Sequence, residues 1–268
     1  MDPCYTWRVS LAAREANLGE IGMSALAMQL REHYALIATD GVELEKRSGV
    51  IKCVRSPIVC LPHFNALLAV AGVRGMPEFI SMHTPPHITD YDGLLQALPS
   101  MVSSAMRTAR TKKLGLEERL PTSIVFVGWS NAAQRFVAHQ ATLDTRAKGD
   151  ASDLVKMKAI LTDDVWRNFS LTSKARSHVG LNRETGDDDI NRLIRHVFAS
   201  RVQYAMRPTW AANDAPVAGG FIKLAAVSRD NQKVWIAHRW DGDHAGATLD
   251  PSLNEELPRN IPDTETSF

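Results

Sequence analysis

Strand-like segments separated by turns of only three or four residues set the strongest limit on the fold of this chain. "ALAMQL" and "YALIATD" flank "REH", "SIVFVGWS" and "QRFVAHQATL" flank "NAA", and "GGFIKLAAVS" and "KVWIAHRW" flank "RDNQ". Turns of this length join antiparallel strands, whereas parallel strands need a crossover of about a dozen residues or more. The pattern therefore favours antiparallel sheets over a parallel doubly wound fold.

Helical patterns lie between these groups of strands. One helix is expected after Thr89, a residue type that caps helices, because apolar residues recur at helical spacing: Leu94, Leu95, Leu98, Val102 and Met106. Pro99 lies inside that pattern and is expected to kink or divide the helix. A second helix is expected after a capping Thr185 on the same grounds: Ile190, Leu193, Ile194, Phe198 and Val202. A short helix is also expected around "DASDLVKMKAIL". Strands in groups, with helices between them, predict an α+β sandwich with helices packed outside the sheets.

Composition and charge limit the partners and the compartment. The 268 residues include 31 basic and 30 acidic side chains, and a net charge of +1 provides no overall field for nucleic acid or an anionic membrane. No apolar run approaches the roughly 20 residues of a membrane span. Three cysteines, Cys4, Cys53 and Cys60, are too few for a disulfide framework and suit a reducing compartment. We therefore expect a cytoplasmic protein that binds neither nucleic acid nor membrane.

The sequence offers no convincing cofactor or metal site. "VAGVRGM" and "VAGG" lack the spacing and the lysine of a phosphate-binding loop. His83 and His87 are separated by two prolines, which prevent the helix that would bring both to one metal ion. "WDGDHAG" lacks the closing glutamate of a calcium loop. We expect no cofactor and no metal.

The first hairpin, "SALAMQLREHYALIATDG", is the stretch that can carry chemistry. A serine acts as a nucleophile without a partner histidine when its own α-amino group is free, because an amine with a pKa near 8 can accept the hydroxyl proton. A nearby lysine lowers the pKa of that amine, and an aspartate keeps the lysine charged and in place.

This hairpin resembles that of the amino-terminal-nucleophile (Ntn) hydrolases, specifically the proteasome β-subunit type and its bacterial and phage-encoded relatives. The resemblance extends from Ser24 to Trp240 and implies a four-layer αββα sandwich of two mainly antiparallel sheets flanked by helices. It makes Ser24 the nucleophile, Asp40 the supporting aspartate, and Lys52 in "GVIKCV" the lysine. It also implies self-processing before Ser24, a peptide or amide substrate, and a homo-oligomer that can be a ring.

The same resemblance suggests three parts of the chain. Residues 1–23 form an N-terminal leader or propeptide-like extension, and residues 24–248 form the proteasome-like domain. Residues 249–268 form a polar C-terminal tail, which is expected to be loosely held because it has little to bury.

Departures from the family pattern keep a second hypothesis open. No glycine-serine loop is evident between Asp144 and Gly186, Ala218 stands where the family has a serine, and Asp214 is displaced by one position. Met23, not a glycine, precedes Ser24. The alternative is a catalytically inactive protein of the proteasome fold with a structural or assembly role, for example in a phage-derived particle.

Each candidate residue also has an ordinary structural interpretation. Ser24 would be a serine at a strand end, and Asp40 would be the first residue of an Asp-Gly turn. Lys52 would be a strand lysine that faces solvent. On local sequence alone, these interpretations stay open.

Overall fold

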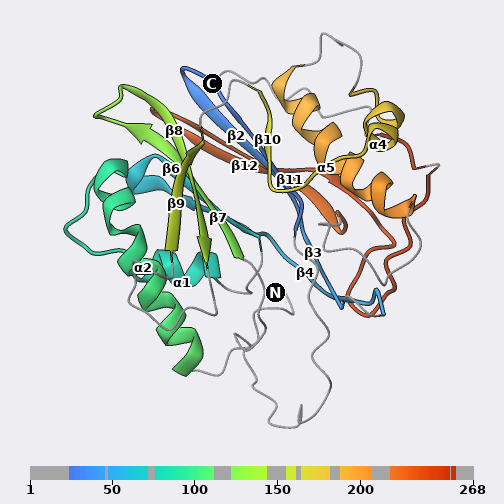
Figure 1. The fold of residues 1–268 in the computed structure, drawn as a ribbon, viewed down its shortest axis with the longest axis horizontal. Helices are drawn as coiled ribbons and strands as arrows, with labels where there is room; N and C mark the ends of the chain where they lie inside the picture. Colours follow the sequence, from blue (N-terminus) through green and yellow to red (C-terminus); the bar gives the residue numbers. More distant parts are fainter. Residues whose placement is uncertain are drawn as a thin grey trace.

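Two five-stranded antiparallel sheets form the centre of the molecule (Figure 1). The computed structural model describes residues 24–45, 48–71, 76–111, 122–143, 155–160, 164–181, 188–206, 218–253 and 255–257. The first sheet contains, in spatial order, β10 (Trp166–Arg167), β1 (Leu26–Leu30), β2 (Tyr34–Asp40), β11 (Phe221–Ser228) and β12 (Gln232–Arg239). The second contains β5 (Ile58–Leu61), β6 (Ala66–Ala71), β7 (Thr122–Ser130), β8 (Arg135–Leu143) and β9 (Val155–Ile160).

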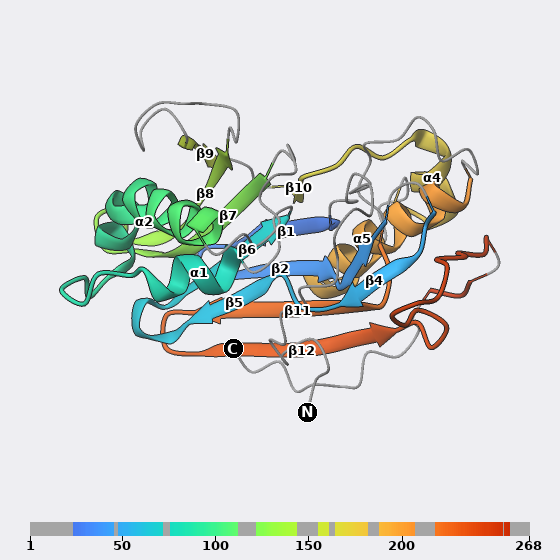
Figure 2. The ribbon, with the colours of Figure 1, turned by 90° about the horizontal axis from the view of Figure 1, so that it is seen from below.

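A short two-stranded ribbon and several helices complete the described part of the chain. The ribbon pairs β3 (Val42–Leu44) with β4 (Ile51–Val54). The helices are the 3-10 turn η2 (Pro62–Phe64), α1 (Met76–Met82), α2 (Tyr91–Thr111), α4 (Ser173–His178) and α5 (Asp189–Ala205). Figure 2 shows α1 and α2 on one side of the strands and α4 and α5 on the other. None of the described helices is both long and apolar enough to cross a membrane.

Three buried apolar layers hold the sheets and helices together. Between the two sheets lie side chains from both of them, including Leu26, Met28, Ile37, Leu67 and Val127. A second layer joins β5 to β8 with α1 and α2, and a third joins β1, β2 and β11 with α5 and with Val179, which follows α4. The order is helices, sheet, sheet, helices, so the expected four-layer αββα sandwich is confirmed.

The predicted hairpins are confirmed, and alternate side chains of their central strands enter different buried layers. β1 pairs with β2, β7 with β8, and β11 with β12, all antiparallel. Because successive side chains point to opposite faces of a strand, Leu36 and Ala38 of β2 face the α5 side while Ala35 and Ile37 face the second sheet. This alternation sets the direction of each side chain near Ser24.

Both long helices begin at an aspartate and not at the predicted threonine. Asp90 accepts the N–H of Gly93 at 2.8 Å, so the expected Thr89 cap is wrong by one residue. Asp188 accepts the N–H of Asn191 at 2.7 Å, and Thr185 lies outside the described residues. A carboxylate also interacts more favourably than a hydroxyl with the positive end of the helix dipole.

Helix α2 runs without interruption through Pro99, so the expected division of this helix is wrong. Proline removes one helical hydrogen bond and crowds the preceding turn. The apolar face of α2 offsets that cost, since it buries side chains on both sides of Pro99: Leu94, Leu98, Met101, Val102 and Ala105.

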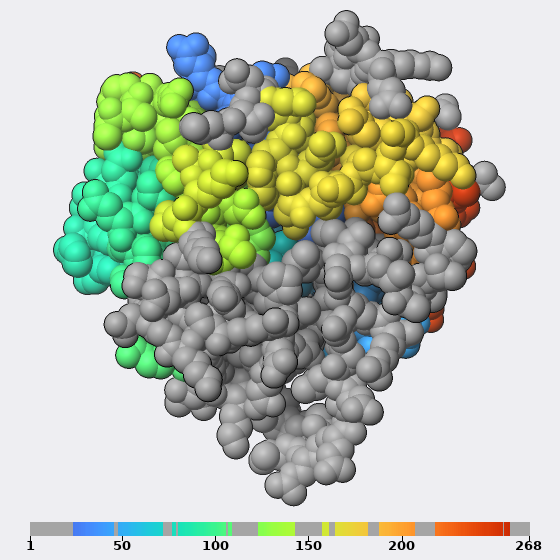
Figure 3. Space-filling view, viewed as in Figure 1, coloured from blue at the N-terminus to red at the C-terminus, as the bar shows by residue number. Residues whose placement is uncertain are grey.

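The helix expected around "DASDLVKMKAIL" is also wrong where the structure describes it, because residues 155–160 form β9. β9 pairs with β8 in antiparallel register, and β10 soon after it pairs with β1. The alternation of apolar and basic side chains from Val155 to Ala159 has the period of a strand, and the edge of β8 provides its hydrogen-bonding partner. This segment and α4 appear in yellow across the face seen in Figure 3, between the second sheet and α5.

A buried histidine on α5 makes the stability of the fold depend on pH. His196 is 6% exposed, and its Nδ1 lies 2.8 Å from the carbonyl oxygen of Arg192, to which it donates. Burial lowers the pKa of His196 to about 4. The unfolded chain therefore binds a proton near pH 6.5, whereas the folded chain binds it only near pH 4, so acid favours unfolding in that window.

We predict that His196→Gln removes this part of the pH dependence. Between pH 7.5 and pH 4 the wild type should lose on the order of 3 kcal/mol more unfolding free energy than the variant. Urea unfolding at several pH values measures the difference. His244→Gln, at an exposed position, should behave like the wild type, and parallel pH profiles for His196→Gln and the wild type would contradict the prediction.

Candidate functional site

The backbone around Ser24 is held by a side chain that lies far away in the sequence. Asn168 follows β10, and its side-chain amide donates to the carbonyl oxygen of Ser24 at 2.9 Å. Its side-chain oxygen accepts the N–H of Leu26 at 2.8 Å, and its own N–H donates to the carbonyl oxygen of Leu26 at 3.1 Å. One asparagine therefore fixes the peptide groups on both sides of Ala25.

Asp40 holds the same stretch from the other side. Its Oδ1 accepts the N–H of Ala25 at 2.8 Å, and its Oδ2 accepts the N–H groups of Val42 and Gly219, both at 3.1 Å. Asp40 is fully buried, and this burial raises its pKa well above the usual range, while the three N–H donors act in the opposite direction. The structure thus brings Asp40 to the residue that follows Ser24.

Asp40 contacts the backbone next to Ser24, at the N–H of Ala25. By strand alternation, Ser24 belongs to the face of Leu26 and Met28, which point toward the second sheet. Asp40 belongs to the face of Ala38, which points toward α5. No hydrogen bond of the Ser24 hydroxyl is recorded within the described residues. Asp40 therefore acts on the position of β1 and not on the Ser24 side chain.

Cross-strand neighbours define what surrounds Ser24 on the face toward the second sheet. Leu26 pairs with Thr39, and Thr39 pairs with Lys223 on β11. Two residues nearer the strand end, the register brings Ser24 opposite Gly41. A Cβ atom on Gly41 would lie 2.3 Å from the ring of Phe221, so only glycine lets that ring pack over the β2 end. On this face, the ring of Phe221 therefore lies on one side of the Ser24 position, and Thr39 and Lys223 lie in the next row of the sheet.

Lys52 lies on β4, in the ribbon apart from the two large sheets. Val54 pairs with Val42, and the N–H of Arg55 donates to the carbonyl oxygen of Gly41 at 2.6 Å. Val54 and Arg55 thus lie at the end of the ribbon near Gly41, and Lys52 lies farther from that end. Among the described residues, the structure records no ion pair or hydrogen bond that joins Lys52 to Asp40.

Lys223 was not predicted from the sequence, although it lies on the face of the first sheet to which Ser24 also belongs. It shares the inter-sheet face with Ala225 and Val227, and no described carboxylate forms an ion pair with it. Burial lowers the pKa of Lys223, and the nearby Cys60 raises it in part. Its sequence signal is a lysine in an otherwise apolar strand, "FIKLAAVS".

The polar groups around Ser24 suit positioning and proton transfer. In the part of the chain that the structure describes, no three side chains of the metal-binding types gather around one point. Asn168 and Asp40 hold peptide N–H and carbonyl groups at the start of β1. The Ser24 hydroxyl and the Lys223 amine are further polar groups on this face. Such groups can orient a nucleophile and adjust the pKa of a neighbouring amine.

We predict that Asn168→Ala loosens the start of β1. The change leaves the carbonyl oxygen of Ser24 and the N–H of Leu26 without their partner, so unfolding free energy should fall by about 1–3 kcal/mol. Amide hydrogen exchange of Leu26 should accelerate more than that of Phe126 in β7. Asn231→Ala, in the β11–β12 turn, is the control, and equal exchange of Leu26 in all three proteins would refute the role of Asn168.

Comparisons with known proteins find a likeness in structure but none in sequence. No protein-family model matches the chain, and a search of curated proteins finds no match. Among solved structures, the chain is similar to the Anbu (Gly-1) mutant from Hyphomicrobium sp. strain MC1, at 13% identity and a TM-score of 0.49. The similarity covers 83% of this chain and 89% of that one. At these values we draw no conclusion about chemistry from it, and the fold rests on the layers and registers described above.

Proposed function

We propose that this protein hydrolyses an amide or peptide bond with Ser24 as an N-terminal nucleophile, after it has cut its own chain before Ser24. One observation carries the proposal: the backbone on both sides of Ala25 is fixed by Asn168 and Asp40. A strand end held by two distant side chains keeps a nucleophile in one geometry, which lowers the entropic part of the reaction barrier.

Self-cleavage would begin with attack of the Ser24 Oγ on the carbonyl carbon of Met23. The acyl group moves from the Ser24 nitrogen to Oγ, and the hydroxyl proton passes to that nitrogen. Water then hydrolyses the ester, which releases residues 1–23 as a carboxylic acid and leaves a free α-amine on Ser24.

Substrate hydrolysis would use the amine that self-cleavage creates. The Ser24 α-amine accepts the hydroxyl proton while Oγ attacks the substrate carbonyl, and backbone N–H groups stabilise the oxyanion. The departing amine takes up the proton, and water hydrolyses the acyl ester to a carboxylic acid. Asp40 would keep the start of β1 in place throughout.

The lysine that lowers the pKa of the α-amine would be Lys52 by sequence resemblance or Lys223 by position. Lys223 is favoured because it lies in the cross-strand row of Leu26, on the same face as Ser24 and two residues away along β1, and two strand spacings, about 10 Å, separate β11 from β1. The four-carbon stem of lysine covers part of that distance.

We predict that Ser24→Ala abolishes both self-cleavage and hydrolysis of peptide or amide substrates, because the attacking oxygen is lost. Intact-mass measurement of the purified protein identifies its first residue, and a peptide library screens for hydrolysis. Ser100→Ala, on the exposed side of α2, should change neither. A wild-type protein that begins at Met1 and cleaves nothing would sink the proposal.

We predict that Lys223→Met slows hydrolysis at neutral pH more than Lys52→Met does. Loss of a nearby positive charge raises the pKa of the α-amine by about one unit, so the acid limb of the pH–rate profile moves to higher pH by that amount. Lys223→Arg should retain the wild-type profile. The reverse order, with only Lys52→Met shifting the limb, would assign the role to Lys52.

One observation favours the alternative of an inactive, structural protein. Both carboxylate oxygens of Asp40 are already used by backbone N–H groups, as expected of a residue that only stabilises the fold. In that case Ser24→Ala would be silent, and the protein would self-associate into an assembly. Light scattering of the wild type tests this, and a monomer without hydrolytic activity would exclude both proposals.

A further inference from the structure

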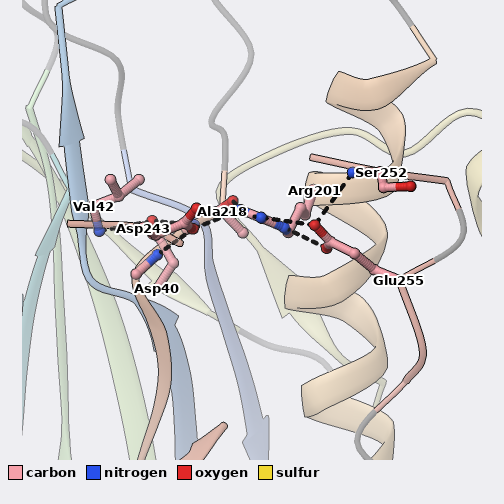
Figure 4. A network of polar contacts seen from close by, with 9 residues as sticks. Asp40, Val42, Arg201, Ala218, Asp243, Ser252 and Glu255 are labelled. Carbon is pink, nitrogen blue, oxygen red and sulfur yellow. Dashed lines mark hydrogen bonds and ion pairs between the residues drawn. The ribbon is translucent and has the colours of Figure 1, made fainter. Parts of the chain in front are cut away.

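A buried arginine on α5 lies at the centre of a polar network that involves two carboxylates (Figure 4). Arg201 is 3% exposed, and its guanidinium forms ion pairs with Asp243 at 2.7 Å and with Glu255 at 2.5 Å. It also donates to the carbonyl oxygen of Ala218 at 3.3 Å. Every N–H group of the guanidinium has an acceptor, because Nη2 contacts a second oxygen of both carboxylates. Arg201 is therefore held in a single geometry.

Asp243, the partner of Arg201, also contacts the two glycines before β11. Its Oδ2 accepts the N–H of Gly220 at 2.8 Å, and Gly220 has a φ of 73°, which favours glycine. A Cβ atom on Gly219 would lie 3.0 Å from the same oxygen, so the carboxylate packs directly against the glycine backbone. Asp243 thus fixes the orientation of the Gly219–Gly220 peptide.

Gly219 connects this peptide to the start of β1. Its N–H donates to Asp40 Oδ2 at 3.1 Å, and its carbonyl oxygen accepts the N–H of Gly41 at 3.1 Å. Consecutive N–H groups of Gly219 and Gly220 therefore serve two different buried carboxylates. Asp40 in turn holds the N–H of Ala25, next to Ser24.

We propose that Arg201 is a positioning residue for the Ser24 site, which it orients through Asp243, the Gly219–Gly220 peptide and Asp40. A buried carboxylate is unfavourable without a partner of opposite charge. Without Arg201, Asp243 would take up a proton or turn toward solvent, and the N–H of Gly220 would lose its acceptor. The consequence for catalysis rests on the proposed function, whereas the consequence for Ala25 does not.

Two further contacts keep Arg201 aimed at Asp243. The guanidinium carbon lies 4.5 Å from the centre of the Trp240 ring, over its face. Glu255 occupies the opposite edge of the guanidinium, and its Oε1 also accepts the N–H of Ser252 at 3.2 Å. Leu249 and Glu255 belong to the tail that was expected to be loosely held, yet Leu249 is 2% exposed. The segment after β12 is thus part of the support for the site.

Amide hydrogen exchange tests the positioning role without reference to activity. In Arg201→Met and Asp243→Asn, the amides of Ala25 and Gly219 should exchange at least about tenfold faster, because each loses part of a charge-assisted network. The amide of Phe126, in the other sheet, should keep its rate. Arg192 is on the same helix as Arg201, and Arg192→Met, which removes its exposed ion pair with Asp164, should leave all three rates unchanged.

Kinetics tests whether the network matters for catalysis. Arg201→Met should lower kcat about tenfold and leave KM unchanged, because Arg201 does not contact the substrate. Arg201→Lys, which retains the charge but not the two-sided fork, should recover part of kcat. If the wild type hydrolyses nothing, the proposed function fails, and the exchange measurement still decides the coupling.

Two results would overturn the inference. One is unchanged exchange of Ala25 in folded Arg201→Met and Asp243→Asn. The other is equal acceleration of Ala25 and Phe126, which would mean that Arg201 stabilises the whole fold and not the Ser24 end. If Arg201→Met does not fold, Asp243→Asn and Glu255→Gln, both close in shape to the wild type, decide the matter.

Discussion

The buried carboxylate of Asp40 is the interaction on which the arrangement of the site depends. Its two oxygens receive N–H groups from three segments that are separate in the sequence: Ala25 before β1, Val42 at the start of β3, and Gly219 before β11. Placing a carboxylate in the protein interior is costly, and three hydrogen bonds from backbone N–H groups offset part of that cost. Because all three donors are backbone groups, their positions are set by strand pairing. Asp40 therefore joins the ends of three strands at one point, with Ser24 beside it.

Most of the fold could be predicted because it follows from local patterns. Three hairpins were evident from apolar runs and short turns, and strand pairing confirms each of them. The errors arose where distant contacts decide. Residues 155–159 alternate apolar and basic side chains, but this strand-like pattern is short, and pairing with the edge of β8 decides the outcome against the longer helical interpretation of residues 150–161. Pro99 is tolerated within α2 because the burial on both sides of it outweighs one missing hydrogen bond. Asp90 caps α2 one residue after Thr89, a difference that residue preferences cannot resolve.

The site was less predictable than the fold, for the same reason. The closeness of Asp40 to the start of β1 follows from a hairpin of known turn length, and the structure places them together. Asn168 could not be found, since its contacts with Ser24 and Leu26 depend on the pairing of β10 with β1. The relation of Lys223 to Ser24 depends on two successive strand registers. Lys52 matched a family pattern in sequence, but its neighbours in space are set by the β3–β4 ribbon.

The network around Arg201 also has a consequence for the order of events during synthesis. Ser24, Asp40 and the first hairpin leave the ribosome early, whereas Asp243 and Glu255 follow only after both sheets and α5 have been made. Until they arrive, the guanidinium of Arg201 has neither of its carboxylate partners, and the Gly220 N–H has no acceptor. A nascent chain would thus carry Ser24 long before it carries Asp243 and Glu255, and under the proposed function its self-cleavage would wait until the domain is complete.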